Sequence, residues 1–373
     1  MKHWLSKRAA LFESSGIRKV FDLGAKLENP INLSIGQPDF DVPGRVREAM
    51  IEAINTKKGG YTPTQGLGIL REQWGEKLRK QYPHHTDRNV FLTSGTSGGL
   101  VLTMLVALDP GDEVIFTDPY FVMYDPLVTM CGGTSVPIDV YPDFKIDVDK
   151  IAAAITPRTK VIIFNSPANP TGYVATRAEI EAVALLAKEK NILLVSDEIY
   201  SMFCYDAPFI SPAEFNPDVL VLDGYSKTHA MTGWRVGVAH GPADFIEQML
   251  KFQQYTFVCA PQVAQWGALA ATEVPMDDYV AAYKRKRDRL VDGIGDLYEL
   301  GNPAGAFYMF PKAPWGTASE FVQKAIERYS MLIIPGGDVF SRRDTHFRLS
   351  YAASDETIER GIEALRRLAK DPD

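Results

Sequence analysis

The chain has 373 residues, a formal net charge of −7 at pH 7 and a hydrophobic fraction of 46%. This length predicts about two domains with a large core, and the acidic balance gives no indication of nucleic-acid binding. Three widely separated cysteines indicate reduced thiols and a cytoplasmic protein, and the sequence contains no CxxC or HExxH metal-binding pattern. It also has neither a signal-peptide pattern nor an apolar run near the ~18 residues of a membrane span.

We expect residues 1–42 and residues 272–373 to fold together as a smaller α+β domain. Residues 43–271 alternate strands and helices, which predicts a large α/β domain with a mostly parallel sheet flanked by helices. In the first segment, the stretch with Phe12 and Ile17 is either a lid that precedes the loop at Gly36 or a helix packed in the smaller domain.

Residues 89–93 predict a short strand, and residues 100–108 form an apolar helical run. Between them, the backbone amides of Gly95, Thr96 and Ser97 would lie at a helix start, where the dipole favours an anion, so the segment predicts a phosphate cup. The same residues match the Gly-x-Ser-x-Gly pattern of a hydrolase nucleophile elbow with Ser97 as nucleophile. That alternative would also need a carboxylate and a histidine, for which the later part of the chain offers His229, His240 and His346.

A strand, a helix and a second strand follow one another after residue 160. The apolar run 161–165 leads into a turn that is rich in proline and contains Asn169. Residues 176–179 form a capping box before a helical apolar stripe, and the next apolar strand ends at Asp197. Because the carboxyl ends of parallel strands meet at one ligand crevice, we expect Asn169, Asp197 and the later Lys227 to lie close together.

Lys227 comes just after the apolar run at residues 219–222, and Arg235 follows eight positions later. Desolvation at the mouth of a buried strand disfavours the ammonium form of a lysine, and the free amine can form an imine with a carbonyl. Arginine can hold a phosphate in a planar, two-pronged grip. An imine-forming lysine beside a phosphate clamp is what pyridoxal phosphate requires.

Three further residues match the ring of this cofactor. Pyridoxal phosphate is a better electron sink when its pyridine nitrogen keeps its proton, and a carboxylate such as Asp197 stabilises that pyridinium. The ring hydroxyl needs hydrogen-bond donors to settle as a phenolate, and Asn169 and Tyr200 can supply them.

Several short segments occur in an order that identifies a family. With them, the chain resembles the pyridoxal-phosphate aminotransferases of fold type I, class I/II, typified by aspartate aminotransferase. The matching segments are Gly36 to Phe40, Tyr61 to Gly66, Thr93 to Ser97, Asn169 to Gly172, Ser196 to Tyr200, Ser226 to Arg235 and Phe347 to Ala352.

The resemblance implies a role for each matching residue around the cofactor. Lys227 would form the Schiff base and later shuttle a proton, Asp197 would pair with the pyridine nitrogen, and Asn169 and Tyr200 would contact the ring oxygen. Phe121 would stack on the ring face. The phosphate would be held by Ser226, Arg235, the amides of Gly95, Thr96 and Ser97, and Tyr61 from the neighbouring subunit.

The resemblance also implies a substrate site and an assembly. Arg348 would bind the substrate α-carboxylate with help from Asn169 and Gly36. The expected function is therefore amino-group transfer between an L-amino acid and a 2-oxo acid by a ping-pong mechanism in a homodimer. Carbon–sulfur lyases and cyclopropane-forming enzymes share these residues and stay open as alternatives. The pocket for the substrate side chain is expected to include Ile17, Tyr124 and Phe257.

Two further segments lie in the C-terminal part. The charge run from Lys284 to Arg289 is interpreted as a solvated helix face, with a nucleic-acid patch as the alternative. Ser354 is expected to cap a final amphipathic helix whose apolar face carries Ile358, Ile362 and Leu365.

Overall fold

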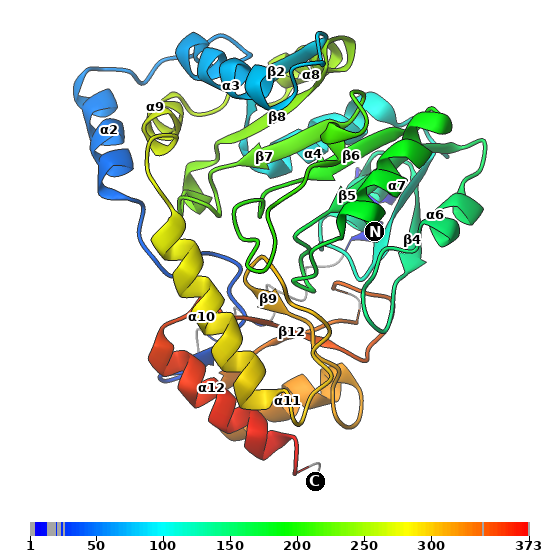
Figure 1. Cartoon of the computed structure of the whole chain (residues 1–373), viewed down its shortest axis with the longest axis vertical. Coiled ribbons are helices and arrows are strands. Elements are labelled where there is room, and N and C mark those ends of the chain that lie inside the picture. The colour runs from blue at the N-terminus through cyan, green and yellow to red at the C-terminus, as the bar shows by residue number, and fades with distance from the viewer. Residues whose placement is uncertain (1–3, 13–19, 21–23, 25–26, 338, 372–373) are drawn as a thin grey trace.

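The computed structural model describes residues 4–12, 20, 24, 27–337 and 339–371 (Figure 1). The predicted lid or helix at Ile17 lies outside these residues, and the domain boundaries after residues 42 and 271 stay predictions. No helix within the described ranges is both long enough and apolar enough to cross a membrane.

The fold is organised around a seven-stranded sheet of order β2-β8-β7-β6-β5-β3-β4. β8 runs antiparallel to both of its neighbours, and the remaining neighbours are parallel, so the predicted mostly parallel sheet is confirmed. The strands are β2 (Arg88–Thr93), β3 (Glu113–Asp118), β4 (Thr134–Asp139), β5 (Thr159–Asn165), β6 (Leu193–Asp197), β7 (Leu220–Gly224) and β8 (Gly237–Pro242).

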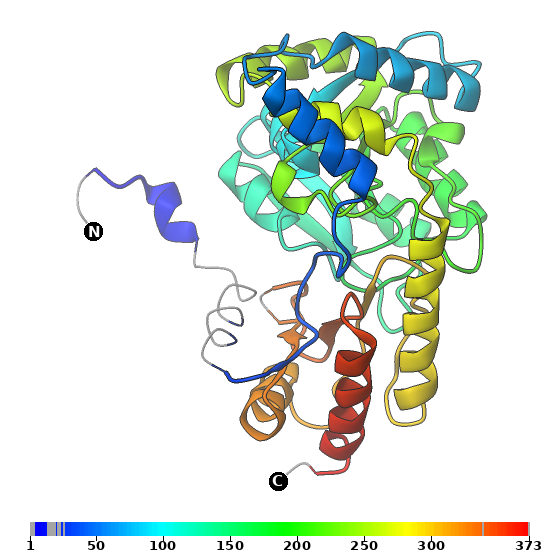
Figure 2. The ribbon, with the colours of Figure 1, turned by 90° about the vertical axis from the view of Figure 1, so that its left-hand side faces the viewer.

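Helices cover both faces of this sheet, because alternate residues of its strands are apolar on both sides (Figures 1 and 2). In β5, Val161 and Ile163 pack into the core with α4, α5 and α8, whereas Ile162 and Phe164 pack into the core with α2, α3, α6, α7 and α9. The helices are α2 (Gly44–Asn55), α3 (Gly68–Gln81), α4 (Gly95–Ala107), α5 (Tyr124–Met130), α6 (Val148–Ala154), α7 (Arg177–Glu189), α8 (Ala243–Tyr255) and α9 (Gln262–Ala271).

A third core lies below the large sheet in Figure 1 and joins the two ends of the chain. β1 (Ile31–Asn32) pairs in parallel with β10 (Met331–Leu332), which brings an early segment against a late one as expected for the smaller α+β part. A three-stranded sheet of order β11-β12-β9 lies beside this pair. The strands of this sheet are β9 (Tyr308–Met309), β11 (Ile334–Pro335) and β12 (Phe347–Ser350). The helices of the third core are α10 (Asp277–Ile294), α11 (Ala318–Tyr329) and α12 (Asp355–Leu368).

Two predicted helix starts are confirmed. The Thr176 hydroxyl accepts a hydrogen bond from the Glu179 amide, and the Glu179 carboxylate accepts one from the Thr176 amide, which completes the capping box of α7. Ser354 caps α12 by accepting from the Thr357 amide. These local motifs satisfy amides that the first helical turn leaves without partners.

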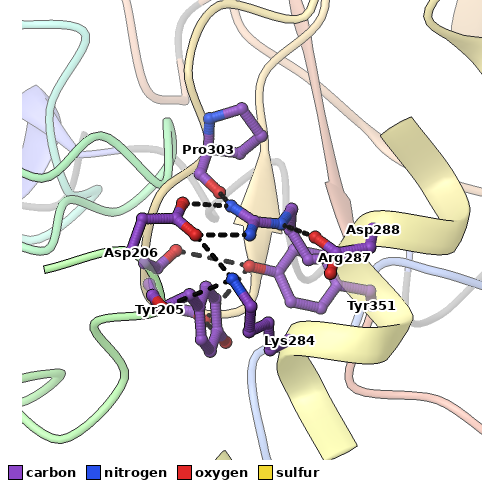
Figure 3. Close-up of polar contacts among 9 residues, drawn as sticks. Tyr205, Asp206, Lys284, Arg287, Asp288, Pro303 and Tyr351 are labelled. Carbon is purple, nitrogen blue, oxygen red and sulfur yellow. Dashed lines mark hydrogen bonds and ion pairs between the residues drawn. The ribbon is translucent and has the colours of Figure 1, made fainter. Parts of the chain in front are cut away.

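The charge run on α10 differs from the expected solvated face (Figure 3). Arg287 is buried, and its guanidinium donates to both Asp206 carboxylate oxygens at 2.9 and 3.0 Å and to the Pro303 carbonyl at 3.0 Å. Lys284 reaches the same carboxylate at 2.6 Å, and Lys286 pairs with Asp39. Asp206 lies on the loop after β6, so Lys284 and Arg287 fasten α10 to that loop, whereas Lys286 fastens it to the segment between β1 and α2.

Candidate active site

A cavity of about 370 Å³ opens at the carboxyl ends of β5, β6 and β7, where the large sheet meets the third core. Of the residues predicted to act on or bind the cofactor or the substrate carboxylate, all except Gly95 and Tyr61 line it. The cavity therefore brings together segments from Gly36 to Arg348, as expected for a ligand crevice at the ends of parallel strands.

Lys227 lies in the turn after β7 with its amine in the cavity. Burial lowers the pKa of this amine to about 8, the positive charges of Arg348 and Arg235 act in the same direction, and Asp197 opposes them. Its Nζ donates to the Gly36 carbonyl, which links the end of the large sheet to the segment after β1. A substantial fraction of the amine is therefore neutral, and nucleophilic, near pH 7 to 8.

Asp197 is the last residue of β6 and is only 3% exposed. Burial raises the pKa of its carboxyl to about 6. The Tyr124 hydroxyl opposes this shift by donating to Oδ2 at 2.8 Å, because a hydrogen bond to the charged form stabilises it. The site thus holds a buried carboxylate with no cation within ion-pair distance in the described part of the chain, which suits it to receive a positively charged ring nitrogen.

Asn169 and Tyr200 lie on the same side of the site and have partners that the sequence did not reveal. The Asn169 side-chain oxygen accepts from Arg348 Nη1 at 3.1 Å, and the Tyr200 hydroxyl lies 3.0 Å from the Tyr308 hydroxyl. Tyr308 lines the cavity too, but its only sequence signal is an apolar strand. The amide group of Asn169 and the two phenols place several donors at one wall.

The first turn of α4 faces Arg235. Gly95 has a φ of +68°, and a Cβ added to it would lie 2.5 Å from Arg235 Nη2, so the missing side chain is what allows the guanidinium to approach the helix start. Arg235 is itself left-handed, with a φ of 52°, and its Nη1 donates to the Thr232 carbonyl at 2.9 Å. Free amides, the helix dipole and a guanidinium therefore converge where an anion can bind.

Arg348 carries a guanidinium that is buried without a carboxylate. The residue is 2% exposed and lies between the rings of Tyr308 and Phe340, each 4.5 Å from the guanidinium carbon. Nη2 donates to the Ser34 carbonyl at 2.9 Å, and Nε has no partner. Burial lowers its pKa, which means that the charge is held at a cost that an incoming carboxylate would offset.

Several other expectations are settled or left open. Tyr124 is buried, its hydroxyl donates to Asp197, and it does not line the cavity, so its predicted place in the side-chain pocket stays a prediction. Phe257 does not line the cavity in this single chain, and Tyr61 is 86% exposed. The described lining contains Ser97 but no histidine, so the arrangement that a serine hydrolase needs is missing there.

Comparisons with known proteins agree with this geometry. The family model described as aminotransferase class I and II matches residues 28–365. The chain belongs to this family. It is 37% identical to a probable aspartate aminotransferase of Methanocaldococcus jannaschii, over 98% of this chain and 99% of that protein. An aromatic-amino-acid aminotransferase of Thermococcus litoralis is 31% identical, over 98% of each chain. The solved aspartate aminotransferase of Thermus thermophilus, with maleate, has a TM-score of 0.91 and 34% identity, over 98% of this chain and 99% of that one.

The protein is therefore a pyridoxal-phosphate-dependent aminotransferase of fold type I. The residues present fit the cofactor on structural grounds. Gly95 leaves room for Arg235 at the start of α4, Asp197 is a buried carboxylate without a cation, and Lys227 has a depressed pKa. The lyase and hydrolase alternatives are not favoured by the family match.

Proposed function

We propose that Lys227 attaches pyridoxal phosphate through Nζ and that the enzyme transfers amino groups between L-amino acids and 2-oxo acids. The observation that carries the proposal is the buried guanidinium of Arg348, which lacks a carboxylate partner and lines the same cavity as Lys227. A fork of this kind matches a carboxylate, and the amine opposite matches a carbonyl carbon. The α-carboxylate and the reacting nitrogen of an amino acid would thus each find a partner.

The cofactor ring would be held by three residues. When bound, pyridoxal phosphate supplies a carbonyl that accepts the amino group and a ring that withdraws electrons from the substrate Cα. Asp197 would keep the ring nitrogen protonated, while Asn169 and Tyr200 would donate to the ring oxygen. Each of these roles is supported by burial, since charge-assisted hydrogen bonds are stronger away from water.

The remaining cofactor contacts would fix the ring face and the phosphate. Phe121 borders the cavity and would stack on the ring. Ser226, Arg235 and the amides of Gly95, Thr96 and Ser97 would hold the phosphate at the start of α4. Because the phosphate is anchored by backbone and guanidinium groups, the reacting part of the cofactor would stay in a fixed position.

Lys227 would have a second task after a substrate amine displaces it. Its freed Nζ can move a proton between the substrate Cα and the cofactor, and its depressed pKa suits it to accept that proton near neutral pH. The Gly36 carbonyl, which accepts from Nζ in this structure, supports the position of the free amine.

We also propose that the active unit is a cytoplasmic homodimer. Tyr61 would reach the phosphate bound by the partner subunit, which is supported by its exposure and by its absence from the cavity of its own chain. Large side chains at Tyr255 and Ile54 are also exposed, at 87% and 60%, as expected where a partner covers the surface. A fully active monomer in analytical ultracentrifugation would contradict the dimer.

The central test is borohydride reduction of the yellow enzyme followed by peptide mapping. The phosphopyridoxyl group should be found on Lys227, and label on another lysine would refute the assignment. Lys227→Ala should bind the cofactor but lose turnover by several orders of magnitude, whereas the exposed Lys251→Ala should behave as wild type. The substrates would then be identified by mixing the enzyme with each amino acid in a single turnover and measuring the loss of the yellow colour.

A further inference from the structure

A second cavity, of about 360 Å³, lies on the other side of the segment that carries Lys227. It shares no lining residue with the active-site cavity, yet Tyr225 and Thr228 line this one while Ser226 and Lys227 line the other. Its other walls come from α3, from the turn after β6 and from the end of α9. An occupant would therefore touch the residues on both sides of the cofactor lysine without reaching the cofactor.

Two residues of this second cavity, His229 and Gln73, each carry a buried polar atom without a hydrogen-bond partner. His229 is 6% exposed, and its Nε2 has no hydrogen-bond partner, nor does the buried Oε1 of Gln73. Burial lowers the pKa of His229 to about 4, which the carbonyls of Ala271 and Val274 only partly offset, so the ring is neutral at pH 7. Its Nδ1 lies 2.8 Å from the Thr228 hydroxyl, which donates to the Gly224 carbonyl at 3.4 Å. Nε2 of His229 and Oε1 of Gln73 are both shielded from solvent, so these two residues form the wall of the cavity and offer no acceptor to a ligand.

The cavity also holds one charge of each sign. Oδ1 of Asp223 accepts from the Gly224 amide at 2.7 Å, and the carboxylate forms no ion pair within the described chain. Lys77 lies over the face of Trp74, 4.3 Å from the ring centroid, and it also has no ion pair among the described residues. Asp223 suits an ammonium group, Lys77 suits a carboxylate, and Trp74, Met202 and Val274 offer apolar contacts.

We infer that this second cavity binds a small amino acid as a zwitterion, as a site separate from the reaction centre. The ammonium would be held by Asp223 and the carboxylate by Lys77. An apolar side chain would rest against Trp74. Binding would order the residues on both sides of Lys227, which makes the site a means for an amino acid to act on the cofactor-bearing segment.

The test uses holoenzyme reduced with borohydride, whose label on Lys227 is first verified by peptide mapping, so failure of that assignment is recognised separately. Isothermal titration with L-leucine should show binding, and isopentylamine and 4-methylpentanoate, which each lack one charged group, should bind at least about tenfold more weakly. No binding of L-leucine, or equal binding of either analogue, would overturn the proposal.

Variants separate this cavity from the active site. Asp223→Asn should weaken L-leucine binding about tenfold and Lys77→Gln roughly threefold, while Lys80→Gln, on the same helix but outside the cavity, should match wild type. If Asp223→Asn does not fold, Lys77→Glu replaces it, and by placing a negative charge against the carboxylate it should weaken binding at least about tenfold. Binding that is lost in Arg348→Lys but kept in Lys77→Gln would place the amino acid in the active site and contradict the inference.

Discussion

The hydroxyl of Tyr124 donates to Oδ2 of Asp197 across 2.8 Å, and both residues are buried. Tyr124 begins α5, and Asp197 ends β6, so the contact connects a helix on one face of the sheet to the edge that carries the candidate site. The bond stabilises the ionised carboxylate against the effect of burial.

Tyr124→Phe should raise the pKa of Asp197 further above its present value of about 6. More of the carboxyl is then protonated at pH 7, so cofactor affinity of the apoenzyme should fall about tenfold there and recover toward pH 8.5. Fluorescence titration with pyridoxal phosphate at both pH values measures this. Tyr141→Phe, which removes a tyrosine hydrogen bond to Ser341 away from the cavity, is the matched control. An equal loss at both pH values would argue for a packing defect.

The rate at which apoenzyme captures the cofactor should rise with pH and level off above a midpoint near 8. The sign follows from the pKa of Lys227, which burial lowers from 10.5 to about 8, because only the neutral amine attacks a carbonyl. Arg348→Met removes a positive charge that lowers this pKa and should move the midpoint to higher pH. Stopped-flow absorbance provides both profiles, and a midpoint above 10 in wild type would contradict the assignment.

Gly95→Ala and Ser97→Ala form a matched pair at the start of α4. A Cβ at Gly95 would lie 2.5 Å from the Arg235 guanidinium at a φ of +68°, so cofactor affinity should fall at least roughly 100-fold. Ser97→Ala should weaken the free energy of cofactor binding by only about 1 kcal/mol, since it removes one hydroxyl while the backbone amides remain. Transamination by Ser97→Ala should persist at saturating cofactor. Loss of nearly all activity in Ser97→Ala would revive a nucleophilic role for this serine.

Arg348→Lys should lower kcat/KM for amino acids by roughly 10- to 100-fold, because an ammonium cannot reproduce a two-pronged pair with a carboxylate. Arg343→Lys, at an exposed position in the loop that leads into β12, should leave kcat/KM unchanged. Steady-state kinetics compare the two variants. If amines without a carboxylate served wild type equally well, the guanidinium would have some other partner.

Arg287→Met should lower the free energy of unfolding by about 1–3 kcal/mol, through loss of the pair with Asp206 and of the bond to Pro303. The half-exposed Asp206 limits the loss, since water can solvate its carboxylate. Its pKa is lowered to about 2, chiefly by hydrogen bonds from Arg287, so the contribution is complete above pH 5 and declines as pH falls toward 2. Urea denaturation at pH 7 and pH 4 measures the free energy of unfolding, with exposed Arg285→Met as control. The difference between wild type and Arg287→Met should be smaller at pH 4.

The sequence was sufficient wherever a signal is local. Strand ends, helix caps and turn residues placed Asn169, Asp197, Lys227 and the start of α4 at one crevice, because each depends on its neighbours in the chain and on the geometry of a parallel sheet. Contacts between remote residues were missed. Tyr308 approaches Tyr200 across 108 positions, and Arg287 reaches Asp206 across 81, and periodicity carries no information on such pairs.

Lys227 follows a strand of the seven-stranded sheet, whereas Arg348 belongs to β12 of the three-stranded sheet. The span that an amino acid must bridge is thus fixed by how one packed body rests on another, and no single helix or strand sets it. Residues that fasten these bodies together, such as Arg287, would then influence which substrates fit without touching one. Substitutions at the contact between the two bodies would therefore change the preference for particular amino acids, as substitutions in the cavity wall would.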